Sequence, residues 1–318
     1  MRDNPWKGLP AGSAGTLSVL RIPVATALEA FWARKPDGRL ALLVTLRHVE
    51  DVPSDLPALR GMEILVMPTE GQLQLVLAST GDWEMFHALS LDLLAASNAG
   101  RDEPEALQLL FARLRRWQRL LSKGGGKLLD EREVRGLIGE LLFLRDRLLP
   151  LAGAAAVACW QGPMGLPQDF VYEGRLVEVK TFAAGSSPSV RIASAEQLTS
   201  VDAPLFLHLV CLVRQEGALT LPAIVDEVRA LLAGSPAHAE AFDDRLLTIG
   251  YIDLAEYRSM AYAPTSVSDY EVRDGFPRLT VQDIPAGVDD VSYSILLGHL
   301  APFAVPSDAV TGEAGGAK

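Results

Sequence analysis

The chain has 318 residues, of which 49% are hydrophobic and 22% are charged. This composition excludes an intrinsically disordered chain, and the length allows about two domains at roughly 150 residues each. With 29 Lys and Arg against 40 Asp and Glu, the net charge is −11. That balance argues against a protein that coats nucleic acid non-specifically, because phosphate binding needs clustered basic side chains. It leaves room for a local basic patch.

Two cysteines, Cys159 and Cys211, lie in apolar stretches without the spacing of a metal or redox motif. We interpret them as buried, reduced thiols, which is typical of a cytosolic protein. The N-terminal sequence lacks a signal-peptide pattern, and no run approaches 18 consecutive apolar residues. The expected location is therefore cytoplasmic, with no membrane span.

In chain order, residues 1–15 are expected to form a loose arm, and the region up to about residue 95 is expected to be β-rich. Turn sequences such as residues 36–39 (PDGR) separate short apolar runs, and residues 72–77 (QLQLVL) alternate with the period of a strand.

Helical spacing of apolar residues then predicts helices over residues 85–96, 103–123 and 130–149. Asp130 is the expected N-cap of the last helix, Glu133 completes a capping box, and Pro150 is expected to end it. Further elements are predicted as strands at 170–172, 176–182, 190–192 and 205–213, a short helix from Ser194, and helices at 221–232 and 239–247. Residues 259–265 and several short runs towards Phe303 are expected to form a further antiparallel portion.

We expect a mixed fold of the α+β or α/β class in four parts. These are a β-rich domain (1–95), a core with leading helices (96–215), an α+β extension (216–305) and a disordered tail (306–318).

Charge is unevenly distributed along the chain. Residues 111–127 hold six basic residues and no acid, whereas residues 200–318 hold seven basic and 17 acidic residues. The basic helix offers candidate phosphate contacts. The favoured alternative is a solvated helix face whose positive charge balances the acidic region of the same chain. The candidate phosphate contacts are Arg113, Arg116, Arg119, Lys123 and Lys127.

The most informative segment is residues 167–182 (PQDFVYEGRLVEVKTF). Residues 173–174 form a candidate hairpin turn, and pairing of the flanking residues then places Asp169 opposite Glu178. Lys180 follows Glu178 by two residues and so points to the same face. One hairpin thus brings together two carboxylates and one ammonium group.

Two such carboxylates repel each other unless a cation joins them. Mg²⁺ fits, with Mn²⁺ as a substitute, because it binds through one or two carboxylates, waters and substrate phosphate. A bound metal would activate water, and the adjacent Lys180 would steady charge on a phosphoryl group. The alternative is an exposed hairpin with a solvated Glu178–Lys180 pair.

Glu140 falls on the apolar face of the helix predicted over residues 130–149. A buried carboxylate needs a partner, which a metal or Lys180 would supply. The alternative is a buried salt bridge to Arg135 or Arg145. Gly136 and Gly139 are expected to let this helix approach a sheet closely.

This set of residues resembles the PD-(D/E)xK nuclease superfamily, whose core is an αβββαβ unit. The predicted element order from about residue 130 to 213 is similar to that core. The resemblance implies a restriction-endonuclease-like core within residues 96–215. The strings at 136–144 (GLIGELLFL), 160–163 (WQGP), 167–170 (PQDF) and 177–180 (VEVK) resemble a bacterial family described as PD-(D/E)xK members.

That resemblance extends over most of the chain, and such proteins tend to be encoded near restriction and phage-defence systems. It implies that Asp169 and Glu178 bind Mg²⁺, that Lys180 assists the water and that Glu140 completes the site. One departure is that a glutamine at position 168 separates proline from Asp169. Gln197 resembles an accessory glutamine of some relatives, or alternatively caps the short helix at Ser194.

The expected function is Mg²⁺-dependent hydrolysis of DNA by an endonuclease of restriction or phage defence. DNA is the expected partner, together with other proteins of a defence system, and a homodimer would suit the cutting of both strands. The alternative is a non-catalytic binding or assembly module built on a nuclease fold. A weaker third reading is action on RNA or single strands, since fold does not fix substrate.

Overall fold

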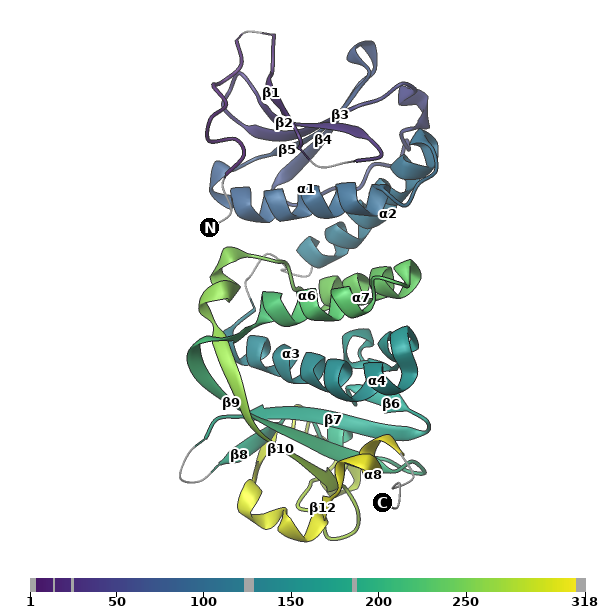
Figure 1. Ribbon diagram of the computed structural model, residues 1–318, viewed down its shortest axis with the longest axis vertical. Coiled ribbons are helices and arrows are strands. Elements are labelled where there is room, and N and C mark those ends of the chain that lie inside the picture. The colour runs from purple at the N-terminus through teal and green to yellow at the C-terminus, as the bar shows by residue number, and fades with distance from the viewer. Residues whose placement is uncertain (1–3, 14, 24–25, 123–128, 185–187, 313–318) are drawn as a thin grey trace. The chain divides into compact units, whose positions relative to one another are not determined.

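The computed structural model describes residues 4–13, 15–23, 26–122, 129–184 and 188–312. The chain divides into two compact units (Figure 1). Unit 1 contains Met1–Leu128 together with Gly250–Ala255, and unit 2 contains Leu129–Ile249 together with Glu256–Lys318.

Unit 1 is an antiparallel sheet with two helices on one face (Figure 1). The strand order is β1-β2-β3-β5-β4. Apolar side chains of α1 and α2, among them Leu93, Leu110 and Phe111, meet Leu42 and Leu75 of the sheet. The elements are β1 (Ser18–Arg21), β2 (Glu29–Arg34), β3 (Leu40–Thr45), β4 (Met62–Met67), β5 (Gln72–Leu77), α1 (Trp83–Ser97) and α2 (Glu103–Ser122).

Helix α2 belongs with this sheet, which differs from the predicted domain boundary at residue 95. That boundary would separate two helices that pack on the same sheet. The helices are also joined by polar contacts, since the Arg113 guanidinium donates to both carboxylate oxygens of Asp92 at 2.7 and 2.8 Å.

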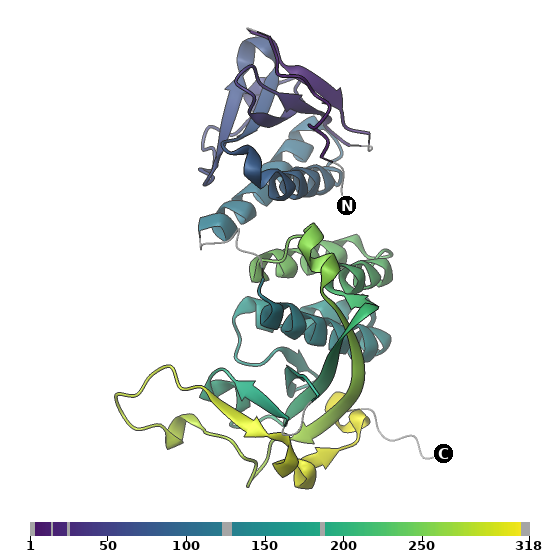
Figure 2. The same ribbon diagram turned by 90° about the vertical axis from the view of Figure 1, so that its left-hand side faces the viewer.

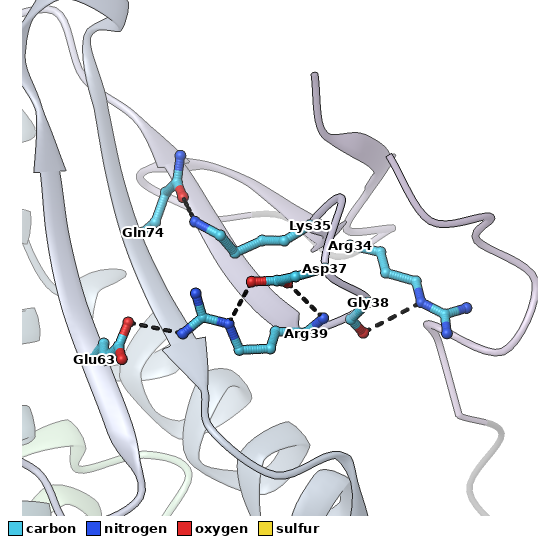
Figure 3. Close-up of polar contacts among 7 residues, drawn as sticks. All are labelled: Arg34, Lys35, Asp37, Gly38, Arg39, Glu63 and Gln74. Carbon is cyan, nitrogen blue, oxygen red and sulfur yellow. Dashed lines mark hydrogen bonds and ion pairs between the residues drawn. The ribbon is translucent and has the colours of Figure 1, made fainter. Parts of the chain in front are cut away.

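The β2–β3 turn is tied to its neighbours by side-chain contacts (Figure 3). Asp37 accepts hydrogen bonds from the backbone and the side chain of Arg39, and Arg39 also pairs with Glu63 of β4 at 2.9 Å. Lys35 reaches Gln74 of β5 at 3.5 Å. These contacts link the turn to two further strands of the sheet.

The predicted loose arm over residues 1–15 is wrong at Trp6. This indole is buried, and its Nε1 donates to the carbonyl of Ala41 at 3.2 Å. Trp6 also stacks on Phe86 and contacts Trp32 edge-on. A large aromatic side chain carries enough apolar area to anchor an otherwise polar segment.

Unit 2 is built on a five-stranded mixed sheet of order β12-β10-β9-β7-β6. Strands β7 and β9 are parallel, and the other pairs are antiparallel. The strands are β6 (Phe170–Tyr172), β7 (Arg175–Phe182), β8 (Ser189–Ile192), β9 (Leu205–Thr220), β10 (Ala261–Glu271), β11 (Tyr293–Leu296) and β12 (Ala304–Val305).

The helices of unit 2 form two layers above this sheet (Figures 1 and 2). Helix α3 packs on β7, and α6 packs on α3. On the opposite face, leucines of β9 form a core with β8, β11 and the C-terminal segment. The helices are α3 (Glu131–Phe143), α4 (Leu149–Ala152), α5 (Ala156–Cys159), α6 (Leu221–Leu231), α7 (Pro236–Ile249) and α8 (Ser307–Thr311).

The order of elements from α3 to β9 follows the expected helix, three strands, short helix and strand. The pairing differs in one respect, because β8 leaves the main sheet and pairs with β11. The connection from β8 to β9 contains a 3₁₀ helix (Ala195–Leu198) instead of a full α-helix. A third strand predicted from its apolar residues alone carries no information about its partner.

Helix α3 begins as predicted and continues further than predicted. The Asp130–Glu133 capping box is present in full. Pro150 does not end the helix, which passes through a π-helical segment (Leu144–Leu148) into α4. Pro150 has no amide hydrogen to donate to the preceding turn, and the π-helical turn directly before it accommodates that break.

The predicted disordered tail is wrong for residues 306–312. Helix α8 forms there, and its Val310 and Thr311 are buried. The apolar residue within this small-residue segment anchors it against the unit. Residues 313–318 lie outside the described residues.

Candidate active site

The hairpin of β6 and β7 has the register that the sequence predicts. Tyr172 pairs with Arg175, and the turn residues Glu173 and Gly174 both have positive φ, at 46° and 75°. Such angles are typical of a two-residue turn that follows the twist of the strands. Asp169 directly precedes β6, and its Oδ2 accepts a hydrogen bond from the backbone of Val179 at 2.8 Å.

Glu178 and Lys180 lie side by side on one face of β7. Glu178 is fully buried, and its Oε1 accepts a hydrogen bond from the Lys180 ammonium group. Within the described residues, the other oxygen, Oε2, is buried without a hydrogen-bond partner. Lys180 keeps 19% of its side chain exposed. The hairpin therefore presents a buried carboxylate with one unsatisfied oxygen beside a cation that solvent can reach.

Glu140 joins this group from helix α3 through a contact that the sequence did not reveal. Trp160 donates its indole Nε1–H to Glu140 Oε2 at 2.7 Å. Trp160 is itself held in place, because Arg245 of α7 donates to its carbonyl at 2.9 Å. A buried indole N–H needs an acceptor, and this was the signal that could have linked Trp160 to a buried acid.

Gly162 lies between the carboxylates of Glu140 and Asp169. The amides of Gln161 and Gly162 both donate to the Asp169 carbonyl, at 2.7 and 3.0 Å. A Cβ atom on Gly162 would lie 2.9 Å from Asp169 Oδ1 and 3.5 Å from Glu140 Oε2. The missing side chain leaves room beside both acids.

Helix α3 approaches β7 closely at one of the two glycines expected to allow it. A Cβ atom on Gly139 would lie 2.4 Å from Thr181 Cγ2 and 3.5 Å from Val179 Cγ1. Gly136 has no atom within 4 Å of its Cβ position, so the expectation for Gly136 is wrong. The close contact sets the distance of Glu140 from the hairpin.

The pKa values of these groups are shifted by burial and by one another's charges. Burial, followed by the charge of Asp169, raises the pKa of Glu140 to about 8, against the opposing hydrogen bond from Trp160. Burial also raises the pKa of Asp169, and burial with the neighbouring acids raises that of Glu178 well above its ordinary value. Although burial lowers the pKa of Lys180, Glu178 and Asp169 raise it above its usual range. Three acids here share one ammonium group.

The predicted alternative partners of Glu140 are engaged elsewhere or show no contact with it. Arg145 pairs with Asp146 and Glu227. Among the described residues, Arg135 forms no ion pair with Glu140, and its Nε is buried without a hydrogen-bond partner. The structure therefore does not contain the alternative salt bridge from Glu140 to Arg135 or Arg145.

Gln197 serves the loop before its short helix. Its Oε1 accepts a hydrogen bond from Ala193 at 2.8 Å, one residue before the predicted cap at Ser194. Gln168, which stands between proline and Asp169, is buried and donates to carbonyls of Glu196, Gln197 and Thr199. Gln168, the residue that replaces a direct Pro-Asp pair, thus anchors the start of the hairpin.

Among the described residues, the predicted phosphate contacts belong to unit 1 and the acids belong to unit 2. Arg113 is a wrong prediction, because its side chain is buried and bound to Asp92 on both carboxylate oxygens. Arg116 and Arg119 lie on α2 and have interactions within the protein. Lys123 and Lys127 lie outside the described residues.

A divalent cation fits the chemistry of this donor set. The cluster has three carboxylates against one ammonium, and Glu178 Oε2 is an orphaned acceptor. Asp169 and Glu178 would hold the ion, because Mg²⁺ takes one or two carboxylates and retains waters. Within the described residues, no three His, Cys, Asp or Glu side chains form a ready-made metal cage.

The mixed α+β fold and this grouping of acids with a lysine are consistent with the PD-(D/E)XK-like class of proteins. A family model described as "Putative PD-(D/E)XK family member, (DUF4420)" matches residues 2–298, and the chain belongs to that family. No curated protein and no solved structure matches the chain. Among the described residues, no helix combines the length and apolar character needed to cross a membrane.

Proposed function

We propose that this protein is a Mg²⁺-dependent endonuclease that hydrolyses phosphodiester bonds of DNA in restriction or phage defence. The observation that carries the proposal is the cluster of three acids, Glu140, Asp169 and Glu178, around the single ammonium group of Lys180. Glu178 is fully buried, Glu140 and Asp169 are half-buried, and the acids outnumber the positive charge. The family assignment supports nuclease-type chemistry. The resemblance to proteins encoded near defence systems supports the biological role.

Each side chain has a distinct task in this proposal. Asp169 and Glu178 bind the metal, which when bound supplies an activated water and neutralises charge on a phosphoryl oxygen. Lys180, held by Glu178 and partly exposed, stabilises the negative charge that develops on the phosphate. Glu140 completes the site, with its carboxylate oriented by the hydrogen bond from Trp160 Nε1.

Cleavage of supercoiled plasmid and linear DNA by the full chain, with Mg²⁺ or Mn²⁺, tests this function. Asp169→Asn and Lys180→Met should each lower the cleavage rate by roughly 10²-fold or more, because the first removes a charged ligand of the metal and the second removes the cation that stabilises the phosphate. Glu173→Gln is the matched control, since this exposed acid lies at the tip of the same hairpin.

Circular dichroism must show that each variant is folded. The function is supported if wild type and Glu173→Gln cleave DNA and both site variants do not. Equal cleavage by all four proteins would show that a contaminant or another site acts. Absence of cleavage on DNA, with RNA and single strands also uncut, would favour the non-catalytic binding module.

A further inference from the structure

Unit 2 contains a cavity of about 390 Å³ that the proposed nuclease chemistry does not use. It lies between α3 with its π-helical continuation and strands β9 and β10. Its apolar part comes from residues such as Phe143, Val210 and Val267, and its polar part includes Arg147 and His208. That volume lies in the range of pockets that bind small molecules.

The cavity is distinct from the candidate active site. In the parallel register of β7 and β9, His208 lies beside Val179, whose side chain faces α3. Glu178 and Lys180 alternate with Val179 and point to the opposite face of the sheet. Glu178 and Lys180 therefore lie on the face of the sheet opposite to the cavity, and no described residue that lines the cavity belongs to the acid cluster.

A buried polar network holds the imidazole and the guanidinium group of the cavity in place. His208 Nδ1 and Asp269 Oδ1 are 2.6 Å apart, and both residues are buried. Ser307 donates to Asp269 Oδ2 at 2.8 Å and accepts a hydrogen bond from Arg147 Nη2, also at 2.8 Å. Asp269 thus fixes the imidazole on one side and, through Ser307, the guanidinium on the other.

The network keeps Asp269 ionised. Burial raises the pKa of Asp269, but hydrogen bonds from His208 and Ser307 and the charges of His208 and Arg147 lower it below its ordinary value. Because Nδ1 of His208 faces Asp269, the other ring nitrogen, Nε2, points away from the pair.

Polar atoms of the two basic residues are left for a ligand. Among the described residues, His208 Nε2 has no hydrogen-bond partner, and neither do Nε and Nη1 of Arg147. A guanidinium group with open donors matches the oxygens of a carboxylate or phosphate. His208 Nε2 would share a proton with such an oxygen.

The backbone beside the cavity has an unusual form. Asp146 and Arg147, which both line it, belong to the π-helical segment Leu144–Leu148. Such segments are rare and are frequently found at functional sites. Asp146 is paired with Arg145, which also pairs with Glu227.

We infer that this cavity binds a small organic oxyanion, a carboxylate or phosphate group carried on an apolar or aromatic body. Arg147 and His208 bind the charged group. Phe143, Val210 and Val267 contact the apolar body. The inference does not depend on the nuclease function, because none of these residues belongs to the acid cluster.

Calorimetric titration of the full chain with phenyl phosphate and with benzoate tests this site, with benzyl alcohol as the uncharged probe. At least one of the two anions should bind saturably at one site, and benzyl alcohol should not. The stronger of the two anions identifies the source as a phosphate or a carboxylate. Absence of binding by both anions at millimolar concentration would overturn the inference.

Two variants place the binding in this cavity. Arg147→Gln and His208→Asn should each weaken binding about tenfold or more, as expected for the loss of a charge-assisted hydrogen bond. In His208→Asn the amide nitrogen takes the place of Nδ1 and keeps the partner of Asp269.

The matched control is Arg229→Gln, since Arg229 is a partly exposed arginine of the same unit that pairs with Asp226 and Asp243. Its affinity should equal that of wild type. Thermal unfolding checks that all variants are folded. Affinity unchanged in folded Arg147→Gln would contradict the assignment.

Discussion

Glu140 illustrates at the scale of one residue how neighbouring acids and loss of solvent change a carboxyl group. Its ordinary pKa is 4.5, and in the folded protein it is about 8, because it is buried near Asp169. Trp160 is the hydrogen-bond donor that opposes this rise. Between those two values the folded chain keeps a proton that the unfolded chain has released.

The free energy of unfolding of the metal-free protein should therefore fall as the pH rises from about 5 to about 8. The raised pKa values of Asp169 and Glu178 act in the same direction. Thermal unfolding of wild type and Glu140→Gln across this range, in chelator, provides the measurement. The variant should show a smaller pH dependence, and an identical slope in both proteins would contradict the raised pKa.

At the scale of elements, the contact between α3 and β7 sets the position of Glu140. Gly139→Ala should lower the free energy of unfolding by about 1–3 kcal/mol, because its Cβ meets Thr181 at 2.4 Å. Gly136→Ala is the matched substitution in the same helix, and it should raise stability by up to about 1 kcal/mol through helix propensity. Urea unfolding measures both, and a stable Gly139→Ala protein would refute the close packing.

Local sequence predicted those parts of the site that local chemistry determines. The turn at Glu173 and Gly174 sets the register that brings Asp169 near β7, and the Asp130 capping box sets the start of α3. Both depend on residues close together in the chain.

The remainder of the site depends on contacts across long stretches of chain. Trp160 donates to Glu140, and the two residues that follow it, Gln161 and Gly162, bond to the backbone of Asp169. Strand β8 pairs with β11, about 100 residues further along. The charge run on α2 likewise did not reveal that Arg113 would turn inward to Asp92. The spacing of apolar residues predicts which face of an element is buried, but it does not predict which other element covers that face.

At the scale of the whole molecule, the net charge of −11 limits where DNA can bind. Arg113 contributes to the fold and not to a DNA surface, because it is buried and bound to Asp92. Arg113→Met should lower the free energy of unfolding by about 1–3 kcal/mol, as expected when the charged hydrogen-bond donor of a part-buried ion pair is removed. DNA affinity of the folded variant, measured by fluorescence anisotropy, should equal that of wild type. A loss of affinity at unchanged stability would contradict this role.

The central claim is that Asp169 and Glu178 hold a divalent ion. The most direct measurement is the anomalous scattering of a crystal of the full chain soaked in Mn²⁺. We predict a peak within about 2.0–2.3 Å of a carboxylate oxygen of each residue, the distance at which small divalent ions bind oxygen. The same soak of an Asp169→Asn crystal should lack it. A soaked wild-type crystal with Mn²⁺ only at other positions, or with none, would contradict the claim.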